Sequence, residues 1–501
     1  MRHRPPLLLP LFVAAALVAG CAADTGVQSK RADTAAPATN GSAPGTTGPA
    51  STVPGSVPAT EPGSGSTGDG VGDSLFPALG NPGVDVQHYD VHVTYDAVTD
   101  QLQGDVTLSV HLSGDRPTFS LDAAGLTVTA VTVDGKPAKF STDAAKLRIT
   151  PASAPGSSVE VEVVYHVKPT TAPSAVGIPD GWFNTPGGSY VLDEPDGARS
   201  WLPCNDHPSD KATYTFTITV GSGVTAVANG VQRDHRTENG HEVWVWQEDR
   251  PMATYLIQVL TGAYDIVEGT GPHGLPLVSA VLTADHATMQ PFIDVTGEQI
   301  AFFEKYFGTF PLDRYGIAIT DSFSGLAMET QERSLFSRDD FSGGRLDPST
   351  QLFLSHELTH QWFGDAVTPA RWRDIWLNES FATYGQWMWG EHVGNGSVAD
   401  SAAAALASRP PGSSADPTVD QLFSYNSYDG GAVVLQALRL TIGDASFFQL
   451  LQQWVIRNNG TSRTTDDFVK LASQISGKDL TKFFATWLFA DQPPSSFPAA
   501  A

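Results

Sequence analysis

The hydrophobic residues of this chain change their spacing near residue 269, and this change limits the folds open to it. Between residues 85 and 268 they alternate with polar residues in β-branched stretches such as "YDVHVTYD", "DVTLSVHL" and "SVEVEVVYHV". A period of two predicts strands with one buried face. Asp134-Gly135 and Asn239-Gly240 lie between such stretches, where hairpin turns are expected. We therefore predict a β-rich domain over residues 73–268.

Beyond residue 269 the apolar residues recur at intervals of three and four. The pattern is clearest in "TMQPFIDVTGEQIAFFEKYFG", "PSTQLFLSHELTHQWFG", "IWLNESFATYGQWMWGEHVG" and "YDGGAVVLQALRLTIG". This spacing predicts helices with one apolar face. The fold class expected is multidomain α+β, with a mostly helical second domain over residues 269–495.

The N-terminal region has the features of an export signal and a linker. A basic start is followed by an apolar run too short to span a bilayer, and residues 1–21 end in "VAGC", which resembles the lipobox of bacterial lipoproteins. Acylation of Cys21 would anchor the chain to the outer face of the membrane; with an ordinary signal peptide the protein would be secreted. Residues 22–72 are almost entirely Ala, Thr, Pro, Gly and Ser, and predict a disordered linker.

Charge narrows the classes of partner. The chain has 54 acidic and 29 basic residues, a formal net charge of −25. Nucleic acids are bound by clustered Lys and Arg, which this sequence lacks beyond its extreme N-terminus. We therefore expect an acidic surface and no nucleic-acid partner.

The stretch "HELTHQWFGD" places His356 and His360 four residues apart, on one face of any helix that contains them. Asp347 is a suitable N-cap and Pro348 a suitable first residue for that helix, and Gly364 is expected at its end. The two imidazoles could then bind one metal ion. Core or surface histidines are the alternative explanation.

A catalytic zinc site has three protein ligands and one open position. Glu379, nineteen residues after His360, can be the third ligand if "QWFGDAVTPARWRDI" forms a helix end, a loop and a return. Glu357 is then free to take a proton from water that the metal has made acidic. We predict one Zn²⁺ per chain, held by His356, His360 and Glu379.

These motifs resemble the gluzincin zinc aminopeptidases of the alanyl aminopeptidase (aminopeptidase N) type, a family that includes leukotriene A4 hydrolase. The similarity rests on "LSHELTHQWFGD" and "WLNESFATY" and extends over residues 85–490. It implies a β-rich saddle or sandwich domain followed by a thermolysin-like zinc domain. Many relatives continue into further domains that cover the site, so the resemblance implies a more open cleft here.

The resemblance also implies a binding site for the substrate's α-amino group. "SGLAMETQERS" is similar to the family's Gly-Ala-Met-Glu-Asn motif, which makes Ala327, Met328 and Glu329 substrate-binding residues. Leu326 and Thr330 depart from that motif. The segment "LDEPDGARSWLPCNDHP" aligns Glu194 with a second amine-binding residue.

"SYNSYDGGAVVLQALRL" is similar to the family's Tyr-x-x-Gly segment and aligns Tyr428 with the residue that stabilises the oxyanion. Tyr425 is the alternative if the register differs. The expected function is thus zinc-dependent removal of the N-terminal residue from peptides with a free N-terminus, as part of peptide catabolism. A non-catalytic surface lipoprotein that binds ligands, and a related endopeptidase or epoxide hydrolase, are the alternatives.

Overall fold

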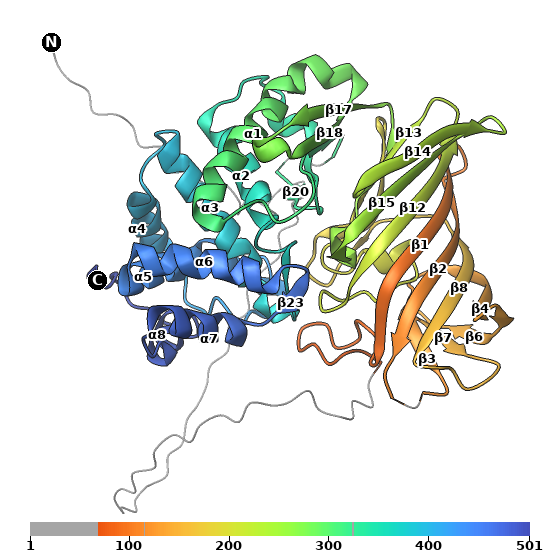
Figure 1. Cartoon of the computed structure of the whole chain (residues 1–501), viewed down its shortest axis with the longest axis horizontal. Coiled ribbons are helices and arrows are strands. Elements are labelled where there is room, and N and C mark those ends of the chain that lie inside the picture. Colours follow the sequence, from red (N-terminus) through yellow and green to blue (C-terminus); the bar gives the residue numbers. More distant parts are fainter. Residues whose placement is uncertain (1–68, 115, 323–324, 501) are drawn as a thin grey trace, which may run out of the picture. The chain divides into compact units, whose positions relative to one another are not determined.

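The computed structural model describes residues 69–114, 116–322 and 325–500, and these residues form one compact unit. Its strands and helices segregate, with the long β-sheet on one side and the helices gathered on the other (Figure 1). The predicted α+β order, β-rich domain first and helical domain second, is confirmed.

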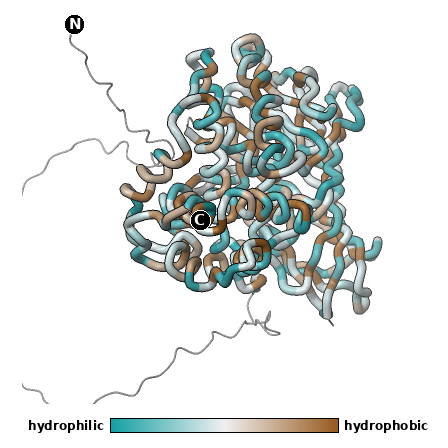
Figure 2. Tube along the Cα trace, turned by 60° about the vertical axis from the view of Figure 1, so that its left-hand side comes forward, coloured by the Kyte–Doolittle hydropathy of each residue, from teal (hydrophilic) through white to brown (hydrophobic). Residues whose placement is uncertain are grey.

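A mixed eight-stranded sheet dominates the first half. Hydrophilic and hydrophobic residues alternate along its strands (Figure 2), and in β1 every second side chain is buried over most of the strand. The turns at Asp134-Gly135 and Asn239-Gly240 connect β4 to β5 and β14 to β15. All four residues have positive φ, as type I′ hairpin turns require. In spatial order the strands are β14 (Val231–Glu238), β15 (His241–Ala253), β12 (Lys211–Gly221), β1 (Val84–Asp96), β2 (Gln101–Leu112), β8 (Ser158–Val167), β4 (Thr127–Val133) and β5 (Lys136–Pro137).

Two smaller sheets complete the β-rich half. One has three strands, β3 (Phe119–Asp122), β7 (Lys146–Thr150) and β6 (Lys139–Thr142). The other has five, in the order β13 (Thr225–Ala228), β16 (Val259–Gly262), β11 (Gly188–Leu192), β10 (Pro179–Thr185) and β9 (Ala172–Pro173).

The second half contains a sheet that the helical spacing did not predict. Five short strands precede or interrupt the first two helices, and the expected boundary at residue 268 falls inside the first of them. Most of these strands are buried and only two to seven residues long, so they lack the alternation that marks a strand in sequence. The order is β17 (Tyr264–Thr270), β18 (Pro276–Leu282), β19 (Ile317–Thr320), β21 (Ser334–Ser337) and, at the edge, β20 (Ala327–Met328).

Helices make up the rest of the second half, and a two-stranded parallel ladder joins the loops that precede α3 and α7. The ladder consists of β22 (Val367–Pro369) and β23 (Thr461–Arg463). The helices are α1 (His286–Phe307), α2 (Pro348–His360), α3 (Trp376–His392), α4 (Val398–Ser408), the π-helical turn η8 (Asn426–Gly430), α5 (Gly431–Ile442), α6 (Asp444–Asn458), α7 (Thr465–Ser476) and α8 (Thr481–Trp487).

The linker was predicted to end at residue 72, and this boundary is wrong. Asp69 accepts two hydrogen bonds from the Arg148 guanidinium, at 2.9 and 2.8 Å, and the backbone N–H of Val71 donates to the Leu79 carbonyl. These contacts order residues 69–72 although their composition is that of a linker. Cys21, the predicted signal peptide and the remainder of the predicted linker lie outside the described residues.

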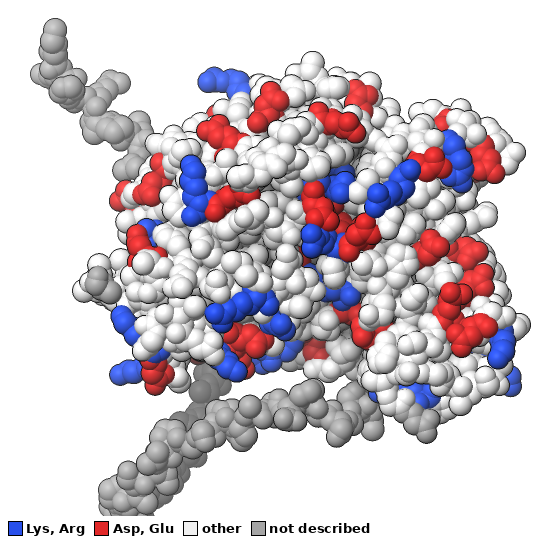
Figure 3. All heavy atoms as spheres, viewed as in Figure 1, with Lys and Arg blue, Asp and Glu red and all other residues white. Residues whose placement is uncertain are grey.

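The described surface carries both signs of charge. On the face shown in Figure 3, acidic and basic side chains are interspersed rather than gathered into a basic patch. Among the described residues, no helix combines the length and apolar character that crossing a membrane requires.

Candidate active site

The three predicted metal ligands converge between two neighbouring helices. α2 supplies His356 and His360, and α3 supplies Glu379. The Glu379 Oε2 atom lies 3.4 Å from Nε2 of His356 and 3.5 Å from Nε2 of His360. All three residues are at least nine-tenths buried. The three side chains therefore present two nitrogens and one oxygen to one point.

Local sequence explains how α2 presents its histidines. Asp347 accepts a hydrogen bond from the backbone N–H of Thr350, and Pro348 occupies the first turn, as expected. We predicted that the helix ends at Gly364, but it ends four residues earlier, at His360. Gly364 instead adopts φ 137°, and a Cβ atom there would lie 3.3 Å from Asn378 and from His360 Nδ1. This close approach brings α3 against the end of α2.

Both histidines have partners on the ring nitrogen that faces away from Glu379. His356 Nδ1 lies 3.2 Å from Gln386 Oε1, and His360 Nδ1 lies 3.3 Å from the Phe363 carbonyl oxygen. Both contacts require Nδ1–H to donate, which leaves Nε2 free as a metal ligand. Sequence reasoning missed Gln386, although its position seven residues after Glu379 places it on the same face of α3.

This donor set fits zinc. Two imidazole nitrogens and one carboxylate oxygen are the ligands of many catalytic zinc sites, which keep a fourth position open. Two further clusters lie beside it, formed by Glu329, Glu357 and His360, and by Glu194, Glu329 and Glu379. The second contains carboxylates alone, which suit a harder cation or an ammonium group better than zinc.

Glu357 and Tyr428 flank the metal ligands. Burial raises the pKa of Glu357 well above its usual range; His360 opposes this, and Glu329 and Glu379 add to it. Tyr428 lies in η8 with its ring 6.0 Å from that of His356. Burial and nearby carboxylates, Glu379 foremost, raise the pKa of its phenol well above the usual value, so the phenol keeps its proton.

Tyr425, the alternative to Tyr428, has a different environment. Its hydroxyl donates to the Ala405 carbonyl at 3.0 Å, at the C-terminal part of α4. The ring contact with His356 therefore belongs to Tyr428.

Glu194 and Glu329 form the carboxylate-lined end of the site. Each has an Oε1 atom that is buried and accepts no hydrogen bond from the described residues. Burial raises the pKa of Glu194 well above its usual value, and Glu329 and Glu379 raise it further. Glu329 Oε1 also lies 3.9 Å from Nδ1 of His360. Buried carboxyls that accept so few hydrogen bonds favour the binding of a cationic donor.

The segment around Glu329 is held by Gln361, the residue that directly follows α2. Gln361 donates through Nε2 to the Glu329 carbonyl at 3.0 Å and accepts at Oε1 from the Glu332 N–H at 2.8 Å. Thr330, one of the two departures from the family motif, is fully buried, and its hydroxyl donates to the Arg333 carbonyl. It therefore stabilises the turn. No pattern in the sequence pointed to Gln361.

Ala327 and Met328 form the edge strand β20. The Met328 side chain is 2% exposed and packs in the core of the β-rich half. Within the described sheet, β20 pairs only with β21, on one side. Its other edge retains backbone groups able to bind an extended peptide.

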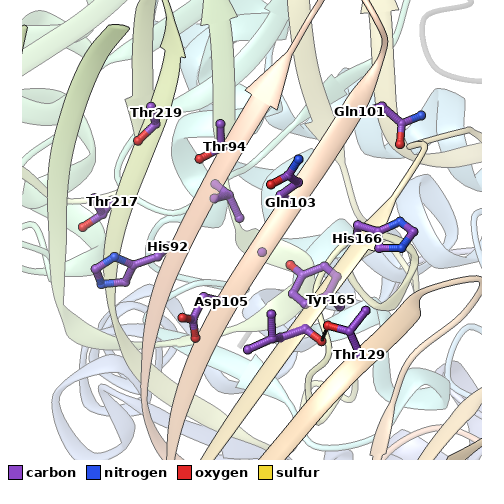
Figure 4. Close-up of a pocket in the computed structure, with 13 residues that line it drawn as sticks. His92, Thr94, Gln101, Gln103, Asp105, Thr129, Tyr165, His166, Thr217 and Thr219 are labelled. Atoms are coloured by element: carbon purple, nitrogen blue, oxygen red, sulfur yellow. Dashed lines mark hydrogen bonds between the residues drawn. The ribbon is translucent and has the colours of Figure 1, made fainter. Parts of the chain in front are cut away.

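A separate hollow of about 680 Å³ lies on the outer face of the eight-stranded sheet (Figure 4). Polar side chains from β1, β2, β8 and β12 surround it, among them His92, Gln103, Asp105 and Thr217. It contains none of the residues predicted for the site.

A β-rich domain followed by a helix pair with two His ligands, one Glu ligand and an adjacent free Glu defines a zinc hydrolase of the metallopeptidase class. Comparison with protein families agrees. The Peptidase M1 N-terminal domain model matches residues 85–256, and the Peptidase family M1 domain model matches residues 292–487. This chain belongs to peptidase family M1, which confirms the predicted family, fold class and zinc.

Solved structures support this assignment. The M1 zinc metallopeptidase from Deinococcus radiodurans is 31% identical, with a TM-score of 0.78, covering 86% of this chain and 100% of that one. A mutant of that enzyme bound to a Tyr-Ser-Ala substrate is similar at 30% identity and a TM-score of 0.76, covering 86% and 99% of the two chains.

Curated relatives carry aminopeptidase names. A leucyl aminopeptidase of Saccharolobus solfataricus is 26% identical over 429 residues, which is 81% of this chain and 53% of the relative. A probable aminopeptidase 2 of Sulfurisphaera tokodaii is 26% identical over 434 residues, covering 82% and 54%. The chain thus spans about half the length of these relatives.

Proposed function

We propose that this protein is a zinc-dependent aminopeptidase that removes the N-terminal residue from peptides with a free α-amino group. The observation that carries the proposal is the pair of buried carboxyls of Glu194 and Glu329, which share a cluster with the metal ligand Glu379. Each has an Oε1 atom that accepts no hydrogen bond from the described residues. The names of the relatives agree with it.

Glu194 and Glu329 bind the substrate's ammonium group. An ammonium offers three N–H donors and a positive charge, and it satisfies both buried oxygens. An acylated N-terminus is neutral and leaves the carboxyls unpaired, so it binds poorly. This difference makes the enzyme an exopeptidase.

Zinc held by His356, His360 and Glu379 would supply Lewis acidity to the scissile carbonyl and to the attacking water. Glu357 accepts the proton of that water and passes it to the amine that leaves. Tyr428 donates its phenolic hydrogen to the oxygen that gains negative charge. The free edge of β20, at Ala327 and Met328, binds the extended peptide backbone.

Initial rates on aminoacyl-nitroanilides with free and acetylated amino groups test the proposal. We expect hydrolysis of the free-amine set alone, loss of activity with a chelator, and restoration by zinc. Glu357→Gln should reduce kcat by roughly 10²- to 10⁴-fold with zinc still bound. Glu238→Gln, an exposed substitution on β14, is the control.

Two outcomes would contradict it. Cleavage of the acetylated set would indicate an endopeptidase and remove the role of Glu194 and Glu329. Zinc bound at one per chain with no turnover of any substrate would indicate a non-catalytic binding protein.

We also propose that Cys21 is acylated and that the enzyme is anchored to the outer face of the cell membrane, where it acts in peptide catabolism. The support is the "VAGC" sequence after a short apolar run. Mass spectrometry of the mature N-terminus should find a diacylglycerol-modified cysteine, and Cys21→Ala should abolish the modification. An unmodified N-terminus would indicate a secreted enzyme.

A further inference from the structure

His356 is held from both sides by a single helix. Its Nε2 atom lies 3.4 Å from Glu379 Oε2, and its Nδ1 atom lies 3.2 Å from Gln386 Oε1. Glu379 and Gln386 are seven residues apart on α3, about two helical turns, and so project from the same face. His356 is only 8% exposed, so the surrounding atoms restrict rotation of its ring.

The hydrogen-bond acceptors behind both histidines are uncharged, and the Glu329 carboxylate lies farther from His360 Nδ1, at 3.9 Å. Gln386 provides an amide oxygen for His356, and Phe363 provides a backbone carbonyl oxygen for His360. A carboxylate in either place would make the imidazole more basic and a stronger metal ligand. Among the three metal ligands, the only formal negative charge is that of Glu379.

We infer that Gln386 is a positioning residue of the metal centre. Its amide oxygen accepts from Nδ1–H of His356 and directs Nε2 at the metal, and its neutrality keeps zinc affinity below that of the same site with a carboxylate acceptor. The residue acts through His356 and has no contact with the metal.

Zinc affinity of the purified full chain tests this inference without an activity assay. The metal-free protein is titrated with zinc against a chromophoric chelator. Gln386→Leu keeps the size of the side chain and removes the acceptor, and it should raise the zinc Kd about 10- to 100-fold. Gln386→Glu restores an acceptor and adds a charge, and it should lower the Kd about 10-fold or more.

Gln87→Glu is the matched control, because Gln87 is exposed on β1 and the substitution adds the same charge far from the metal. It should leave the Kd unchanged. Circular dichroism of the metal-free variants separates loss of fold from loss of affinity. If Gln386→Leu fails to fold, the direction in which Gln386→Glu changes the zinc Kd tests the inference.

An unchanged Kd in folded Gln386→Leu would overturn the inference, and so would an unchanged or raised Kd in Gln386→Glu. The inference rests on the zinc site and not on the proposed aminopeptidase activity. The variants could show the expected zinc affinities while the parent hydrolyses no free-amine substrate. That combination would refute the proposed function and leave the inference about Gln386 intact.

Discussion

Glu379 has two sets of neighbours. On one side its carboxylate meets His356 and His360, and on the other it shares a cluster with Glu194 and Glu329. Histidine contacts, His360 first, outweigh burial and lower the pKa of Glu379 to about 2. It therefore remains ionised at neutral pH, whereas burial raises the pKa of both Glu194 and Glu329.

Tyr428→Phe tests the residue proposed to act on the reacting oxygen. Loss of one hydrogen-bond donor to a developing oxyanion should reduce kcat by about 10²- to 10³-fold, with a smaller change in KM. Steady-state kinetics on a good nitroanilide substrate measure the two constants. Tyr425→Phe should retain most activity, and equal losses in the two variants would contradict the assignment of Tyr428.

A second acidic pair lies outside the three clusters of possible metal ligands. Asp180 and Asp196 approach each other because Gly181 and Gly197 pack backbone to backbone; a Cβ on Gly197 would lie 2.6 Å from the Gly181 nitrogen. Burial raises the pKa of Asp180 to about 8, and Asp196 adds to the effect. The folded protein thus binds a proton here that the unfolded chain releases above its ordinary pKa of 3.8.

This excess of bound protons makes the folded state less stable as pH rises from near 4 to near 8. Asp180→Asn can still donate to Asp196 and does not titrate. The fall in Tm between about pH 5 and about pH 8.5 should therefore be smaller in this variant than in the parent. Thermal scans at both pH values measure it, with the exposed Asp294→Asn as the control. An identical fall in variant and parent would refute the assignment.

How far the site could be predicted depended on sequence distance. His356, Glu357 and His360 share one helix, so their geometry followed from a four-residue spacing. Glu194 and Glu329 come from loops far apart in sequence, and only the family resemblance suggested them. Gln386 was missed because a partially buried glutamine on an apolar helix has no distinctive pattern.

Among the elements, α2 shows how well a helix can be predicted from residues close together in the sequence. Its N-cap, its first-turn proline and its two histidines were all predictable, because each depends on contacts within one or two turns. The strands β17 to β21 were not predictable, because their pairing joins residues as far apart in the chain as Ala280 and Ala318.

Asp347→Ala should lower the free energy of unfolding by about 1 kcal/mol, because it removes the acceptor for the Thr350 N–H at the start of α2. Denaturant unfolding of the metal-free protein measures the change. Asp347→Asn keeps a capping oxygen and should remain close to the parent. A destabilised Asn variant would mean that charge, rather than capping, is what the position contributes.

For the molecule as a whole, the two halves share their interior. The core of the β-rich half includes Met328, Leu335 and Trp372 from the catalytic half. Arg333 is fully buried between the halves; it donates to the carbonyls of Val278 and Ala228 and to Gln258 Oε1, and packs 5.4 Å from the Trp246 ring.

Arg333→Met should lower the stability of both halves together, by about 3 kcal/mol or more, because three buried acceptors lose their donor. Calorimetry should show one transition in parent and variant, shifted to lower temperature in the variant. Arg333→Lys keeps the charge with fewer hydrogen bonds and should fall between them. Separate transitions for the two halves would contradict this coupling.

The position of Glu379 between the two clusters also affects the order in which residues are released. In the proposed function, Glu379 borders both the carboxyls that bind the ammonium group and the metal. Each turnover then leaves a new N-terminus that fits the same place. The enzyme should therefore remove one residue at each turnover, starting from the N-terminus. Amino acids should appear in solution in the order of the peptide's own sequence, and release should pause wherever the next residue fits poorly.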